Sequence, residues 1–307
     1  MRDGDATVLV TVVTYNSAAL LPGLLESLPA ALHPVPWRLA VADNDSHDDS
    51  LTVLRELAPD AVVVEMGRNA GYAAGINAAV AAGGPHTAVL VLNPDVRLDP
   101  GCGPALLAAL REPGVGVAVP LLRDANGERI DSLRREPTVL RTWADAVIGA
   151  ERAGRLGRLG ETVTDAARYR DACDTAWAEG SVQLVDAACW ARVGGWDESF
   201  FLYSEETDFH LRVGDAGRAV RFVPTARATH LEGDSGVSPR LWPLLLANRV
   251  RLARRRGGRR AACAVWAALV LRETSRACLG RPTARAAVRV LLSPRLLRRP
   301  AGPDWVA

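Results

Sequence analysis

The sequence predicts an α/β protein in which a mostly parallel, doubly wound (Rossmann-like) sheet is followed by a C-terminal helical extension. Four apolar runs of strand length alternate with stretches of helical periodicity, at residues 8–13, 37–42, 61–66 and 89–92. Each run ends in polar or glycine-rich residues. Parallel strands joined by helices bring their carboxyl ends to one rim of the sheet, so we expect these polar residues to lie together.

The composition is typical of a globular protein of enzyme size. The 307 residues are 49% hydrophobic and 23% charged, which is enough for a large core and predicts one domain with an appendage. The five cysteines have no metal-ligand spacing, and the first residues, MRDGD, are polar. Both features favour a reducing cytoplasm and argue against a structural zinc site.

Basic residues are concentrated at the end of the chain. From Arg240 onward there are 16 arginines against two acids, Glu273 and Asp304, although the whole chain has a net charge of only +2. We therefore divide the chain into a globular domain of enzyme size, residues 1–239, and a basic helical extension, residues 240–307.

The extension has two interpretations. Its apolar stretch, residues 261–271, is too short at 11 residues to span a bilayer, but helices with basic flanks can lie on an anionic membrane surface. The alternative is a solvated arginine-rich tail, for example a homodimer interface. Nucleic acid is disfavoured as a partner because no recognised binding module accompanies the charge.

The expected rim of the sheet is a site for a nucleotide. Asp43, at the end of the second run, could accept hydrogen bonds from a base or ribose, or could be a turn or cap residue. Arg68 and Asn69, after the third run, could donate to phosphate or sugar oxygens. Asp95, after the fourth, could hold a divalent cation against a diphosphate, although Asn-Pro-Asp is also an ordinary turn.

The glycines near the third run do not form a dinucleotide fingerprint. Gly67, Gly71 and Gly75 are spaced by four and four, and no acidic residue follows at the ribose position. A dinucleotide-binding oxidoreductase is therefore disfavoured, and Gly71 and Gly75 could simply allow close packing of a helix on the sheet.

The middle of the chain is less regular. Further strands are expected at residues 115–122 and 129–133, and another at 182–185. Residues 138–173 have no clear period and are interpreted as a loop-rich insertion without an assigned function.

A second group of polar residues opens a helix. Glu205, Glu206 and Asp208 could complement the helix dipole, or could supply a general base, because adjacent carboxylates raise one another's pKa. His230 stands at a strand end before a Gly/Ser-rich loop, where it is either structural or a metal ligand beside Asp95. Three tryptophans could stack on sugar faces or belong to the core: Trp177, Trp190 and Trp196.

Several of these motifs, in order along residues 7–260, resemble glycosyltransferase family 2 and within it the bacterial rhamnosyltransferase-like branch. The matching stretches are VVTYNS (12–17), VADN (41–44), RNAGYAAGIN (68–77), LNPD (92–95), GGWDE (194–198), FFLYSEETD (200–208), Arg212, and His230 with Gly233 and Ser235. A single motif of this kind would be weak, whereas the ordered set is specific.

The resemblance implies a GT-A fold, a nucleotide-sugar donor, Mn²⁺ or Mg²⁺, and inversion at the anomeric carbon. Asp43 would contact the base, Asp95 and His230 would hold the metal, and Glu206 would be the catalytic base. Asp208 and Arg212 would support that base. Further donor-site residues implied are Thr14, Tyr15, Asn16, Arg68, Asn69, Gly71, Asn77 and Asn93, and the acceptor-side residues are Gly180, Trp196, Asp197 and Arg212.

Two positions depart from the family pattern. Asn93 occupies the first position of the DxD motif, which leaves one carboxylate fewer for the metal. Glu206 stands where Asp is more usual, so the choice of base between Glu205 and Glu206 stays open.

The resulting hypothesis is transfer of L-rhamnose from dTDP-L-rhamnose to a glycan or polyprenyl-linked sugar in cell-envelope biosynthesis. The donor half would be residues 1–120 and the acceptor half 121–239, and the enzyme would be cytoplasmic or peripheral on the membrane. The alternatives are another sugar from UDP or GDP, a non-catalytic glycan-binding homologue, and a nucleotidyltransferase.

Overall fold

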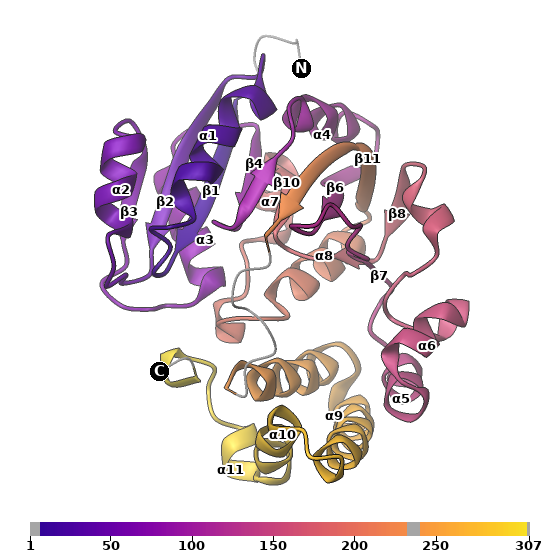
Figure 1. Ribbon diagram of the computed structural model, residues 1–307. Helices are drawn as coiled ribbons and strands as arrows, with labels where there is room; N and C mark the ends of the chain where they lie inside the picture. Colours follow the sequence, from indigo (N-terminus) through magenta and orange to yellow (C-terminus); the bar gives the residue numbers. More distant parts are fainter. Residues whose placement is uncertain (1–6, 232–239, 306–307) are drawn as a thin grey trace.

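The computed structural model describes residues 7–231 and 240–305. Figure 1 shows a domain built on one sheet, with helices on both of its faces, and a separate group of C-terminal helices packed below it. The described strands form a nine-stranded sheet in the order β3-β2-β1-β4-β10-β6-β11-β5, with β8 paired to β11 outside this path. The strands are β1 (Val8–Thr14), β2 (Trp37–Asp43), β3 (Val62–Glu65), β4 (Ala88–Leu92), β5 (Val96–Leu98), β6 (Val115–Arg123), β8 (Cys173–Thr175), β10 (Val182–Asp186) and β11 (Ala219–His230).

The first half of the sheet is parallel, as the sequence predicts. Strand β1 pairs in parallel with β2 and β4, and β2 pairs in parallel with β3. Strand β10 runs antiparallel between β4 and β6, because it follows a long excursion of the chain and not a single crossover helix. The sheet is therefore mostly parallel but mixed, with β11 parallel to β6 and antiparallel to β5 and β8.

Helices cover both faces of the sheet, so its central strands are apolar on both sides. The helices on one face are α1 (Leu21–Leu32), α2 (Ser50–Leu57) and α4 (Cys102–Leu110), and those on the other are α3 (Tyr72–Ala82), α7 (Ala187–Val193) and α8 (Glu205–Asp215). In β4, Leu90 and Leu92 pack against α1 and α4, whereas Val89 and Val91 pack against α3 and α8. The two layers of helices hold the sheet rigid, and with it the edge at which the parallel strands end.

Two expectations about the middle of the chain are wrong. The strand expected at 129–133 is reduced to β7 (Leu133–Arg134), which pairs with β9 (Trp177–Ala178). The insertion expected to be loop-rich is largely helical, with α5 (Val139–Ile148), α6 (Ala150–Arg155), η1 (Gly157–Leu159) and η2 (Ala166–Tyr169).

Helix α5 has a local helical period, with Val139, Trp143 and Val147 spaced by four, which the interpretation of residues 138–173 as a whole missed. The Thr138 hydroxyl caps the helix by accepting a hydrogen bond from the Arg141 backbone N–H at 3.2 Å. Val139 then packs against the apolar cluster of the C-terminal helices. Most helix stability in proteins comes from such packing, which a local sequence window does not contain.

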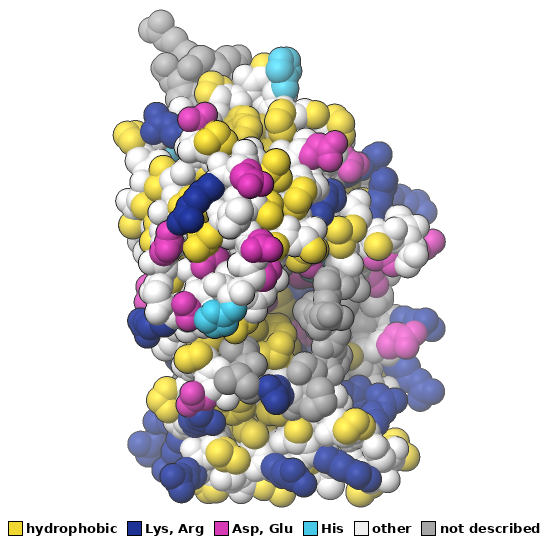
Figure 2. Space-filling model, turned by 60° about the vertical axis from the view of Figure 1, so that its left-hand side comes forward, with side chains coloured by type: hydrophobic (Ala, Val, Ile, Leu, Met, Phe, Trp, Pro, Cys, Tyr) yellow, Lys and Arg dark blue, Asp and Glu magenta, His cyan; other side chains and the backbone are white. Residues whose placement is uncertain are grey.

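The C-terminal helices form their own small core. They are α9 (Leu241–Cys278), α10 (Pro282–Leu292) and α11 (Pro294–Leu297), followed by η4 (Pro303–Trp305). Helix α9 bends back at Gly258, whose φ of 71° is not helical, so that Leu246 of its first half meets Val265 and Leu269 of its second. No helix in the described residues is long and apolar enough to cross a membrane. Figure 2 shows basic side chains gathered over this lower part of the molecule.

The loop before α8 packs directly against Gly71, at the start of α3. Gly71 has a φ of 93°, and a Cβ there would lie 2.5 Å from the Phe201 carbonyl oxygen. The neighbouring Tyr72 N–H donates to that same oxygen at 2.7 Å. Only glycine allows the two segments to approach this closely.

Gly71→Ala should therefore destabilise the protein strongly. Gly127→Ala is the matched control, because Gly127 has a similar φ of 82° but nothing within 4 Å of its Cβ position. We expect Gly71→Ala to lower the free energy of unfolding by about 1–3 kcal/mol more than Gly127→Ala does. Urea denaturation of the two variants measures the difference, and equal losses would contradict the packing argument.

Candidate active site

The ends of β1 and β2 hold Asp43 in a network of hydrogen bonds. Thr14 lies opposite Asp43 in the parallel ladder, and its hydroxyl donates to the carboxylate at 2.7 Å. Ser46 donates to the same group from its backbone N–H at 2.9 Å and from its hydroxyl at 2.6 Å. Asp43 is 2% exposed, so its carboxylate orders the loop after β2 and keeps about one lone pair for a ligand.

The neighbouring rim residues differ in exposure. Tyr15 is 43% exposed, and Arg68 is also exposed, so both are open to a ligand. Asn16, with a φ of 52°, accepts a hydrogen bond from the His47 N–H at 2.8 Å, and Asn69 accepts one from the Gly71 N–H at 3.1 Å. These two amides therefore shape the loops that surround the rim.

Asn77 joins α3 to the loop before α8. Its side chain exchanges hydrogen bonds with the backbone of Trp196, at 2.9 Å to the N–H and 2.8 Å to the carbonyl oxygen. Trp196 is 2% exposed and packs on Tyr72 and Phe209. The Trp196 ring therefore offers no free face for stacking on a sugar. In the structure, Asn77 and Trp196 hold α3 and the loop before α8 together.

Asp95 and His230 meet at the same rim. Strands β5 and β11 pair so that Val96 lies opposite His230, and the Leu231 N–H donates to the Asp95 carbonyl oxygen at 2.9 Å. The His230 Nε2 atom lies 3.3 Å from Asp95 Oδ2, and both residues are 8% exposed. Asn93 begins this turn, and its N–H donates to the carbonyl oxygen of Ser181 at 2.9 Å.

Glu179 completes this group, and the sequence interpretation missed it. Its Oε1 atom lies 2.9 Å from His230 Nδ1. Burial opposes the charged imidazolium, but hydrogen bonds to Asp95 and Glu179 raise the pKa of His230 to about 10. Burial also opposes ionisation of Glu179, yet the hydrogen bond from His230 lowers the pKa of Glu179 below its usual value. An acid directly before Gly180 at a strand end was the available signal.

The donor atoms of this group suit a divalent cation. The described residues contain no three His, Cys, Asp or Glu side chains arranged as a complete metal site. A carboxylate and an imidazole side by side are nevertheless ligands that Mn²⁺ accepts, and such ions often take their remaining ligands from phosphates and water. Glu179 would then fix the His230 ring through Nδ1, as carboxylates commonly do behind a metal-bound histidine.

The two glutamates at the start of α8 have different surroundings. Glu205 is 3% exposed, its Oε2 atom is buried without a hydrogen-bond partner in the described structure, and burial beside Glu206 raises its pKa. Glu206 is half-buried, and burial together with the nearby charge of Glu179 raises its pKa to about 7. Glu206 is therefore the glutamate that can exchange a proton with a ligand near neutral pH.

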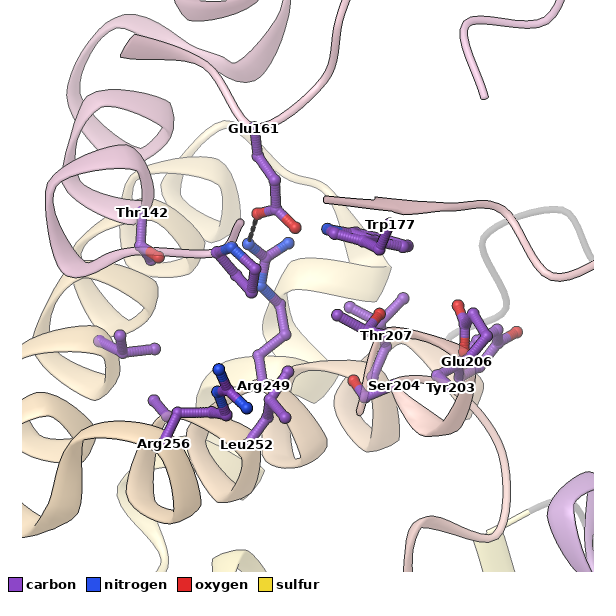
Figure 3. A pocket seen from close by; sticks show the side chains of 14 residues that line it. Thr142, Glu161, Trp177, Tyr203, Ser204, Glu206, Thr207, Arg249, Leu252 and Arg256 are labelled. Carbon is purple, nitrogen blue, oxygen red and sulfur yellow. Dashed lines mark hydrogen bonds and ion pairs between the residues drawn. The ribbon is translucent and has the colours of Figure 1, made fainter. Parts of the chain in front are cut away.

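Glu206 borders a pocket between the sheet domain and the C-terminal helices, with a cavity of about 110 Å³. Figure 3 shows Glu206 and Tyr203 at one end, the Trp177 ring on one wall, and Arg249 of α9 paired with Glu161 across the space. The remaining lining residues are Pro137, Thr142, Ser204, Thr207, Leu245, Leu252, Ala253, Arg256 and Val265. No sequence pattern predicts the helical wall of this pocket, because the wall depends on how α5 and α9 pack.

Four further predicted residues lie in α8 or contact the segments around it, and they do not line this pocket. Asp208 accepts a hydrogen bond from Arg212 Nε at 2.8 Å, and Arg212 also donates to the carbonyl oxygens of Val193 and Gly195 at 2.7 and 2.9 Å. Asp197 is paired with Arg255 of α9. A Cβ on Gly180 would lie 3.0 Å from the Glu206 Cβ, so Gly180 leaves room for the Glu206 side chain.

His210 holds α8 against the strand that carries Glu179. Its Nδ1 accepts a hydrogen bond from the Ala178 N–H at 3.2 Å, so its Nε2 donates to Gln183 Oε1 at 2.8 Å. Burial lowers the pKa of His210 to about 3, so the ring is neutral. The positions of Glu179 and Glu206 are therefore coupled through a fixed, uncharged histidine.

Comparison with known proteins now decides the family. The sequence model described as "Glycosyl transferase family 2" matches residues 9–170. A curated N-acetylglucosaminyl-diphospho-decaprenol L-rhamnosyltransferase from Mycobacterium tuberculosis is 33% identical over 247 residues, covering 74% of this chain and 76% of that protein. The chain belongs to glycosyl transferase family 2. It is a glycosyltransferase, as the sequence motifs indicate.

Solved structures confirm the GT-A fold. A mannosyltransferase from Pyrobaculum calidifontis, solved with GDP-Man and Mn²⁺, superposes with a TM-score of 0.57 at 16% identity, covering 94% of this glycosyltransferase and 84% of that chain. Residues 1–349 of S. aureus TarS, solved with UDP-GlcNAc, give a TM-score of 0.54 at 16% identity, covering 87% and 73%. At these identities the likeness concerns the fold alone.

The raised pKa of Glu206 predicts a pH-dependent cost in stability. Since the folded protein binds this proton more tightly than the unfolded chain does, the wild type loses stability as the pH rises from about 4.5 through 7. Glu206→Gln cannot ionise, so at pH 8 we expect it to be more stable than the wild type by on the order of 1 kcal/mol, with no gain near pH 4.

Denaturant unfolding at the two pH values measures this effect. Glu56→Gln is the control, because Glu56 is exposed on α2 and the change should alter stability little at either pH. A Glu206→Gln protein that is no more stable than the wild type at pH 8 would show that the carboxyl is not destabilised by burial.

Proposed function

We propose that this glycosyltransferase is an inverting, metal-dependent rhamnosyltransferase that transfers L-rhamnose from dTDP-L-rhamnose to a lipid-linked N-acetylglucosamine. The observation that carries the proposal is that the Asp95–His230 pair contacts Glu179, which lies near Glu206, and that Glu206 lines the pocket beside α9. The name of the M. tuberculosis relative supports the choice of rhamnose and of a diphospho-polyprenol acceptor.

Asp95 and His230 would hold a divalent cation at the donor diphosphate. When bound, the ion neutralises the negative charge that develops on the leaving group. Glu179 keeps the His230 ring in place through Nδ1 at 2.9 Å. The exposed Arg68 lies on the same rim and can donate to phosphate or sugar oxygens.

Glu206 acts as the general base in a single displacement. The acceptor hydroxyl oxygen forms a bond to the anomeric carbon, while the bond from that carbon to the diphosphate oxygen breaks and its electron pair leaves with the nucleoside diphosphate. The hydroxyl proton passes to the Glu206 carboxylate. A pKa of about 7 suits this role, because a base works best when its pKa is near the operating pH.

The acceptor sugar occupies the pocket between α8 and α9. Trp177 supplies an aromatic wall there, and sugars stack on such faces. Arg249 and Arg256 of α9 also line the pocket, where they are paired with Glu161 and Asp215. A diphosphate-linked acceptor would have to replace one of these carboxylates as the partner of an arginine. Of the three tryptophans for which the sequence suggested stacking, this proposal gives the role to Trp177.

The donor and the metal can be tested without an acceptor. We expect dTDP to raise the melting temperature in the presence of Mn²⁺ more than UDP or GDP does, because a ligand that binds only the folded state stabilises it. Asp95→Ala should abolish the manganese-dependent part of this shift, whereas Glu206→Gln should keep it. With dTDP-rhamnose and a polyprenyl-diphospho-GlcNAc acceptor, Glu206→Gln should lose at least about 100-fold in turnover.

The outcomes separate the alternatives. A preference for UDP or GDP would retain the enzyme class and change the sugar. Binding without transfer to a panel of acceptors would favour a glycan-binding homologue, and pyrophosphate release from a nucleoside triphosphate would indicate a nucleotidyltransferase. Near-normal turnover of Glu206→Gln would show that another group is the base.

The C-terminal helices lie on an anionic membrane surface, next to the lipid-linked acceptor. Their exposed face combines arginines with exposed leucines: Leu271, Leu279, Leu292 and Leu296 are 47%, 78%, 55% and 36% exposed. Figure 2 shows the basic side chains with hydrophobic ones between them. Basic residues attract anionic headgroups, and exposed leucines insert at the acyl boundary.

Vesicle sedimentation tests this contact. The wild type should bind vesicles that contain phosphatidylglycerol and not those of phosphatidylcholine alone, and binding should weaken as salt is added. Arg285→Glu with Arg289→Glu, one turn apart and exposed on α10, should reduce binding. The control is Arg170→Glu with Arg192→Glu, two exposed arginines of the sheet domain. Equal binding by both double variants would contradict this surface, and a change in oligomeric state instead would favour a dimer interface.

A further inference from the structure

The loop that leads into α8 has an unusual backbone. Phe201, Tyr203 and Ser204 have φ values of 64°, 68° and 75°, a conformation that residues other than glycine rarely adopt. Each such residue costs about 1 kcal/mol or more, so the conformation persists only where surrounding contacts hold it. Glu205 and Glu206 follow immediately, so this loop sets where the two glutamates point.

Asn248 of α9 makes the contacts that hold this loop. Its Nδ2 atom lies 2.9, 2.9 and 3.0 Å from the carbonyl oxygens of Phe200, Leu202 and Tyr203. Asn248 is 0% exposed, so water does not compete for these hydrogen bonds. The two N–H donors of this amide thus serve three carbonyl oxygens of the loop, so at least one donor is shared. The Phe200 oxygen also accepts a hydrogen bond from the Leu202 N–H at 2.7 Å.

Two arginines on the same face of α9 extend the contact. Arg251 donates to Asn248 Oδ1 at 2.7 Å, which fixes the amide with its nitrogen toward the loop, and to the Ser199 carbonyl oxygen at 3.0 Å. Arg255 pairs with Asp197, donates to the Ser199 hydroxyl at 2.8 Å and lies 4.7 Å from the centre of the Phe200 ring. The spacing 248, 251 and 255 places all three side chains on one helix face.

We infer that Asn248 is a positioning residue for catalysis: through Asn248, the C-terminal helices hold the strained 200–204 loop in the conformation that presents Glu206 to the acceptor pocket. This inference rests on the proposed role of Glu206 as the base. The first half of α9 is then part of the catalytic apparatus, in addition to any contact that the later helices make with a membrane.

Hydrogen–deuterium exchange of the 200–206 backbone tests the clamp without any substrate. Asn248→Asp keeps the shape of the side chain but replaces the donor with an acceptor, so exchange at 200–206 should become faster. Leu246→Ala is the matched control, because Leu246 is also 0% exposed on α9 but packs among the C-terminal helices. It should lower the melting temperature without raising exchange in the loop. Unchanged exchange in Asn248→Asp would overturn the inference.

Kinetics then test the link to catalysis. In Asn248→Asp, kcat should fall about 100-fold, since displacing a catalytic group by about 1 Å can lower the rate by that factor. The rise in melting temperature caused by nucleotide should stay as in the wild type. Arg255→Met, a surface change with little risk to folding, should lower kcat less and leave nucleotide binding unchanged. A normal kcat in Asn248→Asp despite a loosened loop would overturn the inference. A wild-type protein that transfers no sugar would instead contradict the proposed function, while the exchange rates still decide the clamp.

Discussion

The antiparallel pairing of β5 with β11 is the interaction on which the site depends. It sets Val96 opposite His230, so a carboxylate from the first half of the sheet and an imidazole from its last strand meet at 3.3 Å. Because backbone hydrogen bonds fix the two chain segments at this point, only the side-chain rotamers of Asp95 and His230 remain to set the distance. Glu179, which directly follows β9 of the separate two-stranded sheet, then contacts the ring from the other side.

Much of this arrangement could be predicted, because its causes are local. The apolar runs of the first four strands and the polar residues that end them are contiguous in sequence, and they correctly indicated a rim that contains Asp95. The direction of β10 could not be predicted in the same way, since it depends on partners far away in the chain. A short segment carries no information about which strand or helix it will meet.

Polar motifs were the least decisive part of the sequence. Asn77 and Arg212 looked like ligand-binding residues, and the structure uses both to satisfy backbone groups of the loop before α8. A side chain needs the same donors and acceptors for either task, so its type does not separate them. The proposal of Glu206 over Glu205 likewise rests on their surroundings in the structure, because successive helix residues point about 100° apart and a sequence pattern does not determine the rotation of α8.

The two sides of the proposed reaction centre are built from different stretches of chain. The proposed nucleotide rim comes from the loops after β1 to β4, whereas much of the pocket wall comes from α9 and the insertion before β8. With that pocket as the acceptor site, donor and acceptor preference can diverge independently during evolution. A chimera with a new C-terminal segment would keep its nucleotide and change the sugar it extends, provided that the new helix retains an asparagine at the position of Asn248.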